Sequence, residues 1–230
     1  MLELTPLEVE ALGLSLKVAL WSVLGSLPFG LAVAWLLGRR EFFGKTLLDG
    51  IVHLPLVLPP VVVGYLLLVL LGRNGPLGAW LFEHFGITLA FTWEGAALAA
   101  AVMAFPLMVR AMRLSIEAID QKLETAARTL GATRLDVFFT VTLPLTLPGI
   151  LAGAVLAFAR SLGEFGATIT FVSNIPGETR TLPLALYSLI QTPGGETGAL
   201  RLAVLSVLLS LAALAASEFI ARRLKARLAG

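Results

Sequence analysis

The sequence contains no cysteine and only two histidines in 230 residues. The missing cysteines exclude disulfides and cysteine-ligated metal sites, and they leave the redox compartment open. Two histidines leave little material for a metal cluster or for a nucleophile activated by a base. The sequence therefore predicts no catalytic residues, no metal site and no cofactor bound by the chain itself.

Charged residues are also scarce. They form 14% of the chain, whereas a typical soluble domain has roughly 25%. Two runs, Val18 to Gly38 and Gly50 to Gly72, hold no Asp, Glu, Lys or Arg. Each is longer than the roughly 18 apolar residues that indicate a membrane span, and backbone groups in lipid need partners within their own segment. The runs predict transmembrane helices, and the net charge of +2 gives no indication of nucleic-acid binding.

No soluble domain and no internal repeat is visible, so residues 1–230 are predicted to form a single all-α integral membrane domain. A short interfacial helix is expected in 74–91, where apolar residues recur at helical spacing. The prolines at 55, 59 and 60 should kink the second span. The five predicted spans cover about residues 14–37, 51–72, 92–112, 148–172 and 200–221.

Basic residues are shared unevenly between the two sets of loops, and cytoplasmic loops of membrane proteins carry an excess of Lys and Arg. This asymmetry predicts an external N-terminus and a cytoplasmic C-terminus, with only Arg73, Arg180 and Arg201 on the outer side. The acidic start lacks a basic region and a small-residue cleavage site, so no cleaved signal peptide is expected. The twelve basic residues on the predicted cytoplasmic side are Arg39, Arg40, Lys45, Arg110, Arg113, Lys122, Arg128, Arg134, Arg222, Arg223, Lys225 and Arg227.

The segment from Gly38 to Thr46 has the outline of a phosphate-binding loop, since a second glycine is followed by Lys45 and a threonine. Five residues lie between its two glycines, where the nucleotide motif requires four, and it follows a membrane helix instead of a strand. We therefore predict that the chain has no ATPase of its own.

A helix–turn–helix is predicted in the cytoplasmic loop of about 113–147. Good helix formers run from Glu117 to Leu130, and Gly131 can adopt the left-handed conformation that ends a helix. Thr133 and Asp136 resemble a capping box that starts a second helix. Pro144 should end that helix, because the residue before a proline disfavours the helical conformation.

The same loop resembles the EAA loop of ABC importer permeases, a pattern of Glu-Ala-Ala, three residues, Gly, nine residues, Ile, one residue and Leu-Pro. Thr125 stands at the glutamate position, with Glu124 one residue earlier, and Val141 replaces the isoleucine. The resemblance implies an ABC type-1 transmembrane domain, over about residues 12–221, and a coupling helix that docks on a separate ATPase. The predicted coupling residues are Glu124, Ala126, Ala127, Arg128, Gly131, Leu135, Phe138, Val141, Leu143 and Pro144.

The resemblance also implies partners. In that family a homodimer of permeases binds two cytoplasmic ATPase subunits, which use ATP and magnesium, and an external binding protein delivers the substrate. Movement of the coupling helices then switches the membrane helices between inward- and outward-facing states. This chain would accordingly be a multi-pass protein of the bacterial cytoplasmic membrane.

A second resemblance concerns the substrate. The segments 160–171, 174–183 and 191–196 are similar to those of molybdate permeases, and less so to those of sulfate permeases. The likeness extends from His53 onward. It implies transport of molybdate, or of its analogue tungstate, with a sulfate or thiosulfate permease as the alternative. An ion-coupled secondary transporter fits less well, because it would leave the coupling loop unexplained.

Charged residues in the predicted fourth span are costly in lipid and usually face protein or water. Arg160 and Glu164 are one helical turn apart and can pair with each other. Two readings stay open: a structural ion pair in the core, or groups on the oxyanion path together with Ser161 and Thr168. An oxyanion offers only acceptors, so a path needs such donors.

Overall fold

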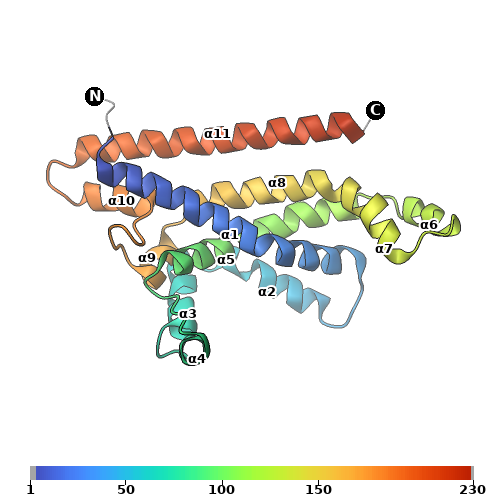
Figure 1. Cartoon of the computed structure of the whole chain (residues 1–230), viewed down its shortest axis with the longest axis horizontal. Helices are drawn as coiled ribbons and strands as arrows, with labels where there is room; N and C mark the ends of the chain where they lie inside the picture. The colour runs from blue at the N-terminus through green and yellow to red at the C-terminus, as the bar shows by residue number, and fades with distance from the viewer. Residues whose placement is uncertain (1–3, 229–230) are drawn as a thin grey trace.

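The computed structural model describes residues 4–228, and their side chains except those at 217, 218 and 220–228 (Figure 1). Within that range the chain is helical and contains no strand. The elements are α1 (Pro6–Arg39), α2 (Lys45–Val57), α3 (Pro60–Leu71), α4 (Pro76–Phe85), α5 (Trp93–Glu117), α6 (Gln121–Thr129), α7 (Arg134–Val137), the π-helical turn η1 (Phe138–Thr142), α8 (Leu143–Leu162), α9 (Gly166–Val172), α10 (Leu182–Ile190) and α11 (Glu196–Leu228).

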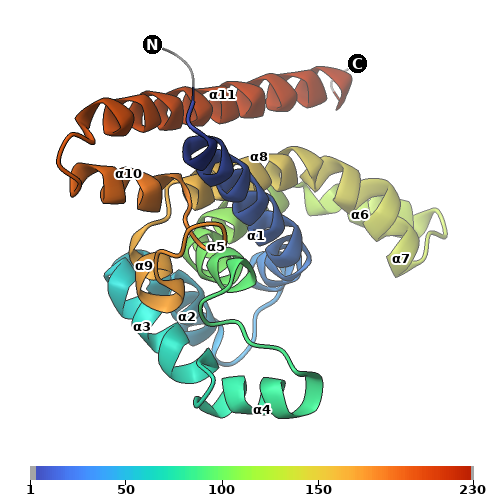
Figure 2. The same ribbon diagram turned by 60° about the vertical axis from the view of Figure 1, so that its left-hand side comes forward.

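Four helical stretches are long and apolar enough to cross a membrane, and a bent pair adds a fifth candidate. The four are α1, α5, the continuous stretch Arg134–Leu162 and residues Glu196–Ala216 of α11. They run lengthwise beside one another, whereas α3 and α4 project from the bundle (Figures 1 and 2). The predicted all-helical class with about five spans is confirmed.

The second predicted span, 51–72, is not one kinked helix. It consists of α2 and α3, which are bent by 114° relative to each other at Leu58 and Pro59. Leu58 is extended, as expected for a residue before a proline, and neither Pro59 nor Pro60 has an N–H to continue the helical ladder. Two successive prolines therefore separate the halves completely.

The fourth predicted span, 148–172, is also divided. Its helix begins at Arg134, inside the segment predicted as a loop, and α8 ends at Leu162. Gly163, Glu164 and Phe165 interrupt it before α9 begins. The predicted interfacial helix corresponds to α4, while α10 lies in a segment for which no helix was predicted.

Helix α5 is the centre of the bundle, between α1 and α8 (Figure 2). Its buried face is rich in alanine, including Ala96, Ala99 and Ala100. Helix α8 turns Gly149 and Gly153 toward it, and a Cβ on Gly149 would lie 2.2 Å from the Cβ of Ser115. Small residues allow such close backbone approach, which is the main source of helix association in lipid.

The α1–α2 loop, the α6–α7 segment and the C-terminal end of α11 all lie at one end of the molecule (Figure 1). These are the three segments predicted to be cytoplasmic, and the basic side chains at 222–227 among them lie outside the described side chains. Their common position agrees with the predicted grouping. Which side of the membrane this end faces stays a prediction.

Candidate functional site

The predicted coupling loop begins with α6. Helix α5 ends at Glu117, and Asp120 starts α6 as its N-cap by accepting a hydrogen bond of 2.9 Å from the Lys122 N–H. The helix predicted from Glu117 to Leu130 is therefore shorter at both ends. An aspartate cap satisfies a backbone donor that would otherwise be exposed at the helix terminus.

A glycine turn follows α6, as predicted. Gly131 has φ +92°, and the N–H of Ala132 donates to the Ala127 carbonyl over 3.1 Å, which closes the end of the helix. No atom of the described residues lies within 4 Å of the place where a Cβ of Gly131 would stand, so the need for glycine is conformational and not steric. The predicted capping box of Thr133 and Asp136 is present and starts α7.

Pro144 does not end the second helix, and that prediction was wrong. The chain passes from α7 through η1 into α8 without a break. In η1 the hydrogen bonds span five residues, and the N–H of Leu143 reaches the Phe138 carbonyl. This wider turn replaces the α-helical turn with which the ring of Pro144 would clash, so the proline becomes an early residue of α8.

Glu124 anchors α6 to two other elements. Its Oε1 accepts hydrogen bonds of 2.9 Å from Arg39 Nη2 at the end of α1 and from the Thr142 hydroxyl in η1. The side chain of Arg39 is 8% exposed and that of Glu124 19% exposed. Neither Arg39 nor Thr142 was identified from the sequence. The sequence pointed to Arg39 in one way only, as a basic residue directly after the uncharged run of the first predicted span.

The outer surface of the segment carries several exposed apolar side chains among its polar ones. Leu135 and Phe139 are exposed, while Phe138 is half-buried and packs edge-on against Phe139 with ring centroids 5.1 Å apart. Leu130, which was not predicted, is 89% exposed beside the glycine turn. The remaining predicted coupling residues divide by exposure: Ala126 and Arg128 are exposed, and Ala127, Val141, Leu143 and Pro144 are half-buried.

The break between α8 and α9 contains the charged pair. Arg160 Nη1 lies 2.8 Å from Glu164 Oε2, and the other Glu164 oxygen accepts from the N–H of Ala167 over 2.8 Å. The Glu164 side chain is 1% exposed and that of Arg160 28%. Glu164 therefore neutralises Arg160 and receives a free backbone donor of α9, where a carboxylate also interacts favourably with the helix dipole.

The nominated hydroxyl donors are already used inside the bundle. Ser161 lies 2.8 Å from the hydroxyl of Ser22 in α1, and Thr168 donates to the Phe165 carbonyl over 2.9 Å. Both residues are buried. This geometry favours the structural reading for Ser161, Glu164 and Thr168, and it leaves Arg160 as the member of the set with an accessible cationic surface.

The two broken spans meet each other. A Cβ on Gly64 of α3 would lie 2.5 Å from the carbonyl oxygen of Ala167 in α9, and one on Gly166 would lie 2.7 Å from the ring of Pro60. Helices α3 and α9 lie side by side in both views (Figures 1 and 2). Each span is therefore divided where it contacts the other, in backbone-to-backbone packing.

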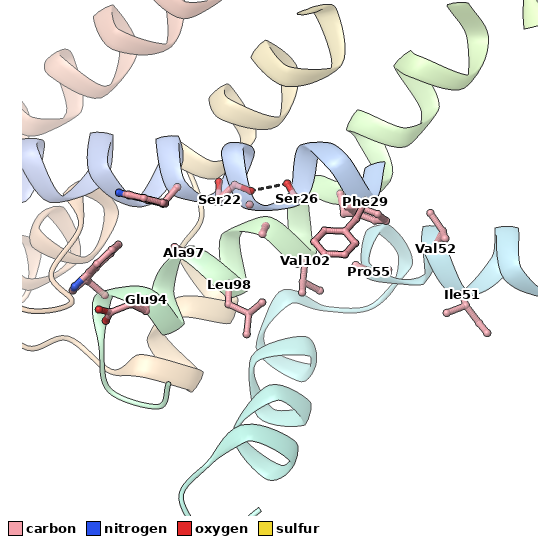
Figure 3. A pocket seen from close by; sticks show the side chains of 15 residues that line it. Ser22, Ser26, Phe29, Ile51, Val52, Pro55, Glu94, Ala97, Leu98 and Val102 are labelled. Atoms are coloured by element: carbon pink, nitrogen blue, oxygen red, sulfur yellow. Dashed lines mark hydrogen bonds between the residues drawn. The ribbon is translucent and has the colours of Figure 1, made fainter. Parts of the chain in front are cut away.

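An apolar cavity of about 630 Å³ lies between α1, α2 and α5 (Figure 3). Phe29, Val52 and Leu98 line it, together with Ser22 and Ser26. Both serines donate to backbone carbonyls of α1, over 2.8 and 2.6 Å. Since no Lys or Arg is among the described residues that line this cavity, its chemistry does not suit an oxyanion.

The described residues thus form an all-helical bundle with a helical loop held by polar contacts and with two broken spans. The chain belongs to the family of binding-protein-dependent transport system inner membrane components, whose model matches residues 26–226. It is therefore a multi-pass inner-membrane protein with an ABC type-1 permease fold.

Particular relatives can be named. The chain is 68% identical over 219 residues to the molybdenum transport system permease protein ModB of Escherichia coli (strain K12), covering 95% of this chain and 96% of that protein. Its identity to ModB of Haemophilus influenzae is 61%, covering 96% and 97%. The sulfate transport system permease protein CysT of Escherichia coli is 43% identical, covering 71% of this chain and 58% of that one. A bacterial alginate ABC transporter, solved in complex with an alginate-bound periplasmic protein, has the same fold with TM-score 0.75 and 18% identity, covering 96% of this chain and 81% of that one.

Proposed function

We propose that this chain is the permease subunit of an ATP-driven importer that carries molybdate across the cytoplasmic membrane. The observation that supports this most strongly is the identity of 68% to a molybdenum permease along 95% of the chain. Tungstate has the same charge and nearly the same size, so we expect it to share the path. A sulfate or thiosulfate permease is the second candidate, and its support is weaker because the identity is lower and shorter.

The proposed assembly is a homodimer of this chain with two ATPase subunits on its cytoplasmic face and a molybdate-binding protein on the other. ATP and magnesium belong to the ATPase. The family description supports the presence of a binding protein. Membership of this family also argues against the alternative of an ion-coupled secondary transporter. Residues 1–230 are proposed to act as one membrane domain.

The coupling contact is proposed to lie on the α6–α7 segment. Leu130, Leu135 and Phe139 would enter a groove of the ATPase, because each is exposed and apolar at the end of the molecule that holds the basic loops. Ala126 leaves room for close approach. The supporting feature is the connection behind this surface, where Glu124 joins α6 to Arg39 of α1 and would transmit movement to the bundle.

Arg160 is proposed as the substrate-facing cation near the break of α8. Its guanidinium is partly exposed while its partner Glu164 is buried, so one side remains available to an anion. Arg160→Gln should lower the rate of molybdate uptake at low substrate concentration more than at saturation. Equal loss at all concentrations would assign the residue to folding instead.

The proposed function is tested with the assembled transporter in liposomes. ATP-dependent uptake of molybdate should require the ATPase and the binding protein, and tungstate should compete with it. Sulfate should compete at least tenfold less well. Uptake that is driven by an ion gradient without ATP, or equal competition by sulfate, would overturn the proposal.

Orientation needs a separate measurement. Reporter fusions after Asn74 and after Ile175 should give an external signal, and a fusion at Gly131 a cytoplasmic one. An external signal at Gly131 would place the proposed coupling segment on the wrong side of the membrane, whatever substrate is carried.

A further inference from the structure

A second cavity, of about 850 Å³, lies between the C-terminal third of α1 and the α6–α7 segment. It is separate from the apolar cavity of Figure 3 and from the break between α8 and α9. One wall is α1, and the other is formed by α6, α7 and η1. The cavity is therefore polar near Arg39 and Arg40, at the end of α1, and apolar along the preceding turns of that helix.

Among the residues whose side chains the structure describes, four arginines line this cavity: Arg39, Arg40, Arg128 and Arg134. Glu124 is the acidic residue among the lining side chains, which leaves a formal charge of +3. Its carboxylate is occupied by Arg39 and Thr142. The other three guanidinium groups are exposed and form no ion pair with the residues that the structure describes. The cavity thus carries an excess of cationic donors.

Arg39 itself is incompletely satisfied. Its side chain is 8% exposed, and its Nε is buried with no hydrogen-bond partner within the described part of the chain. A buried donor without an acceptor is costly, so natural proteins normally supply one. Arg39 is one of the residues that line the same cavity, although its Nε is itself covered.

The apolar wall follows one face of α1. Pro28, Leu31, Ala32 and Trp35 line the cavity at helical spacing below Arg39, and Arg40 lies over the Trp35 ring at 5.3 Å from its centroid. Residues 28 to 39 cover about 16 Å of helix at 1.5 Å per residue. That length is close to half of the roughly 30 Å hydrocarbon thickness, which is the depth of one leaflet.

From this combination we propose that the cavity binds an anionic phospholipid. The phosphate would lie among the arginine side chains, and one acyl chain would follow the apolar face of α1 toward the middle of the bilayer. Basic pockets between helices at the membrane surface bind acidic head groups in this way. On the proposed orientation, the lipid comes from the cytoplasmic leaflet and contacts the segment that couples transport to ATP hydrolysis.

The apolar wall distinguishes a lipid from other anions. A free phosphate or another small oxyanion would use the arginines alone and would leave the α1 face uncovered. An acidic segment of the ATPase would cover the rim from the aqueous side. Both remain outcomes of the experiment.

The test uses the full transporter, with its ATPase, in nanodiscs and then in mild detergent. Native mass spectrometry counts the phosphatidylglycerol and phosphatidylcholine molecules that stay bound during delipidation. We expect phosphatidylglycerol to be retained preferentially by the wild type. The double variant Arg40→Gln/Arg134→Gln should bind it about tenfold more weakly or worse. Each basic residue near a membrane surface strengthens the binding of an acidic lipid by roughly fivefold, and this variant removes two of them. Arg73→Gln is the matched control, since Arg73 also lies over an aromatic ring, 4.5 Å from the Phe82 centroid, but outside this cavity.

A second variant tests the apolar wall. Ala32 is exposed and lines the cavity. Ala32→Trp keeps every charge but would fill the space that the acyl chain is proposed to occupy, so this variant should also release phosphatidylglycerol. Unchanged retention in either variant, or equal retention of phosphatidylcholine, would overturn the proposal. Displacement by millimolar inorganic phosphate would show a simple anion site. Retention by the permease alone, but not by the complex, would show that the ATPase covers the cavity.

Discussion

The α6–α7 segment and the contact between α3 and α9 are held in opposite ways. None of the nine residues of α6 is buried, and the helix is joined to α1 by the ion pair of Glu124 with Arg39. At the other contact, Gly64 approaches the backbone of Ala167 so closely that an added Cβ would lie 2.5 Å from its carbonyl oxygen. One region depends on polar groups and backbone conformation, and the other on the absence of side-chain atoms.

The difference follows from the two solvents. Lipid provides no hydrophobic driving force between helices, so helices there associate through close packing of small residues. A segment in water can rely on hydrogen bonds, caps and exposed surface that a partner covers. We therefore expect the α3–α9 contact to fail when an atom is added. The α6–α7 segment should fail when a charge or a backbone conformation is changed.

The largest expected effect is at Gly64. Gly64→Ala places a methyl group against backbone that cannot rotate away, and overpacking of this kind costs about 1–3 kcal/mol or more. We expect a lower yield of folded protein and a lower melting temperature in detergent, measured by fluorescence-detected size exclusion after heating.

The matched control is Gly50→Ala in α2, the other half of the same broken span. Within the described part of the chain, a Cβ on Gly50 would meet no atom within 4 Å. Replacing glycine in a helix by alanine stabilises by roughly 0.5–1 kcal/mol, so the control should be neutral or slightly more stable. If both variants lose the same stability, the close contact between α3 and α9 is not what holds this region.

The next effect is at Gly131, where the strain is in the backbone. A β-branched residue at φ +92° is strongly disfavoured, at a cost of order 1–3 kcal/mol. Gly131→Val should leave insertion and the melting temperature of the membrane bundle nearly unchanged while it tilts α6. Binding of the ATPase in a pull-down and ATP-driven molybdate uptake should both fall.

Gly131→Asn separates backbone conformation from side-chain size, because asparagine tolerates the left-handed region better than valine. It should keep most of the ATPase binding, since the structure places no described atom within 4 Å of the added Cβ. Wild-type binding by the valine variant would mean that the turn has no part in coupling.

These two regions also differ in how far sequence predicts them. The glycine turn and the capping box of Thr133 with Asp136 are local, so spacing alone was sufficient. The first span was equally visible, as a run of residues without charge. Pro144 was misjudged because a local rule against proline in helices gave way to a π-helical turn, which depends on the following helix being held in the bundle.

Contacts between distant segments were not predictable from one sequence. Glu124 and Arg39 are 85 residues apart, and nothing in their local patterns selects one partner over another. The bend of 114° between α2 and α3 likewise needs α9 as its support, although the two prolines marked its position. Prolines predict where a helix breaks, while packing decides the angle.

A smaller effect is expected at Arg39. Arg39→Met keeps much of the apolar length of the side chain and removes its ion pair with Glu124, whose carboxylate keeps the Thr142 hydroxyl and some solvent. Loss of a charged hydrogen-bond partner here should cost about 1 kcal/mol in the stability of the segment. The expected readout is more ATP hydrolysed for each molybdate transported, because α6 would move without α1.

Glu124→Gln, made alone and together with Arg39→Met, completes a double-mutant cycle. If the two residues act as a pair, the double variant should be no worse than the more affected single variant. Additive losses would mean that each acts separately, and α1 would then have no direct role in coupling.

The smallest effect is expected at Lys45, close to Arg39 in sequence. Its Nζ lies 2.7 Å from Glu41 Oε1, but the Glu41 side chain is 89% exposed, and exposed ion pairs contribute only about 0.2–1 kcal/mol. Lys45→Met should therefore leave ATP hydrolysis, uptake and melting temperature within error of the wild type. The same variant tests the apparent phosphate-binding outline of this segment, since a nucleotide loop would lose activity with its lysine. If Lys45→Met were as harmful as Arg39→Met, burial would not be what distinguishes the two ion pairs, and the proposed connection between α1 and α6 would lose its physical basis.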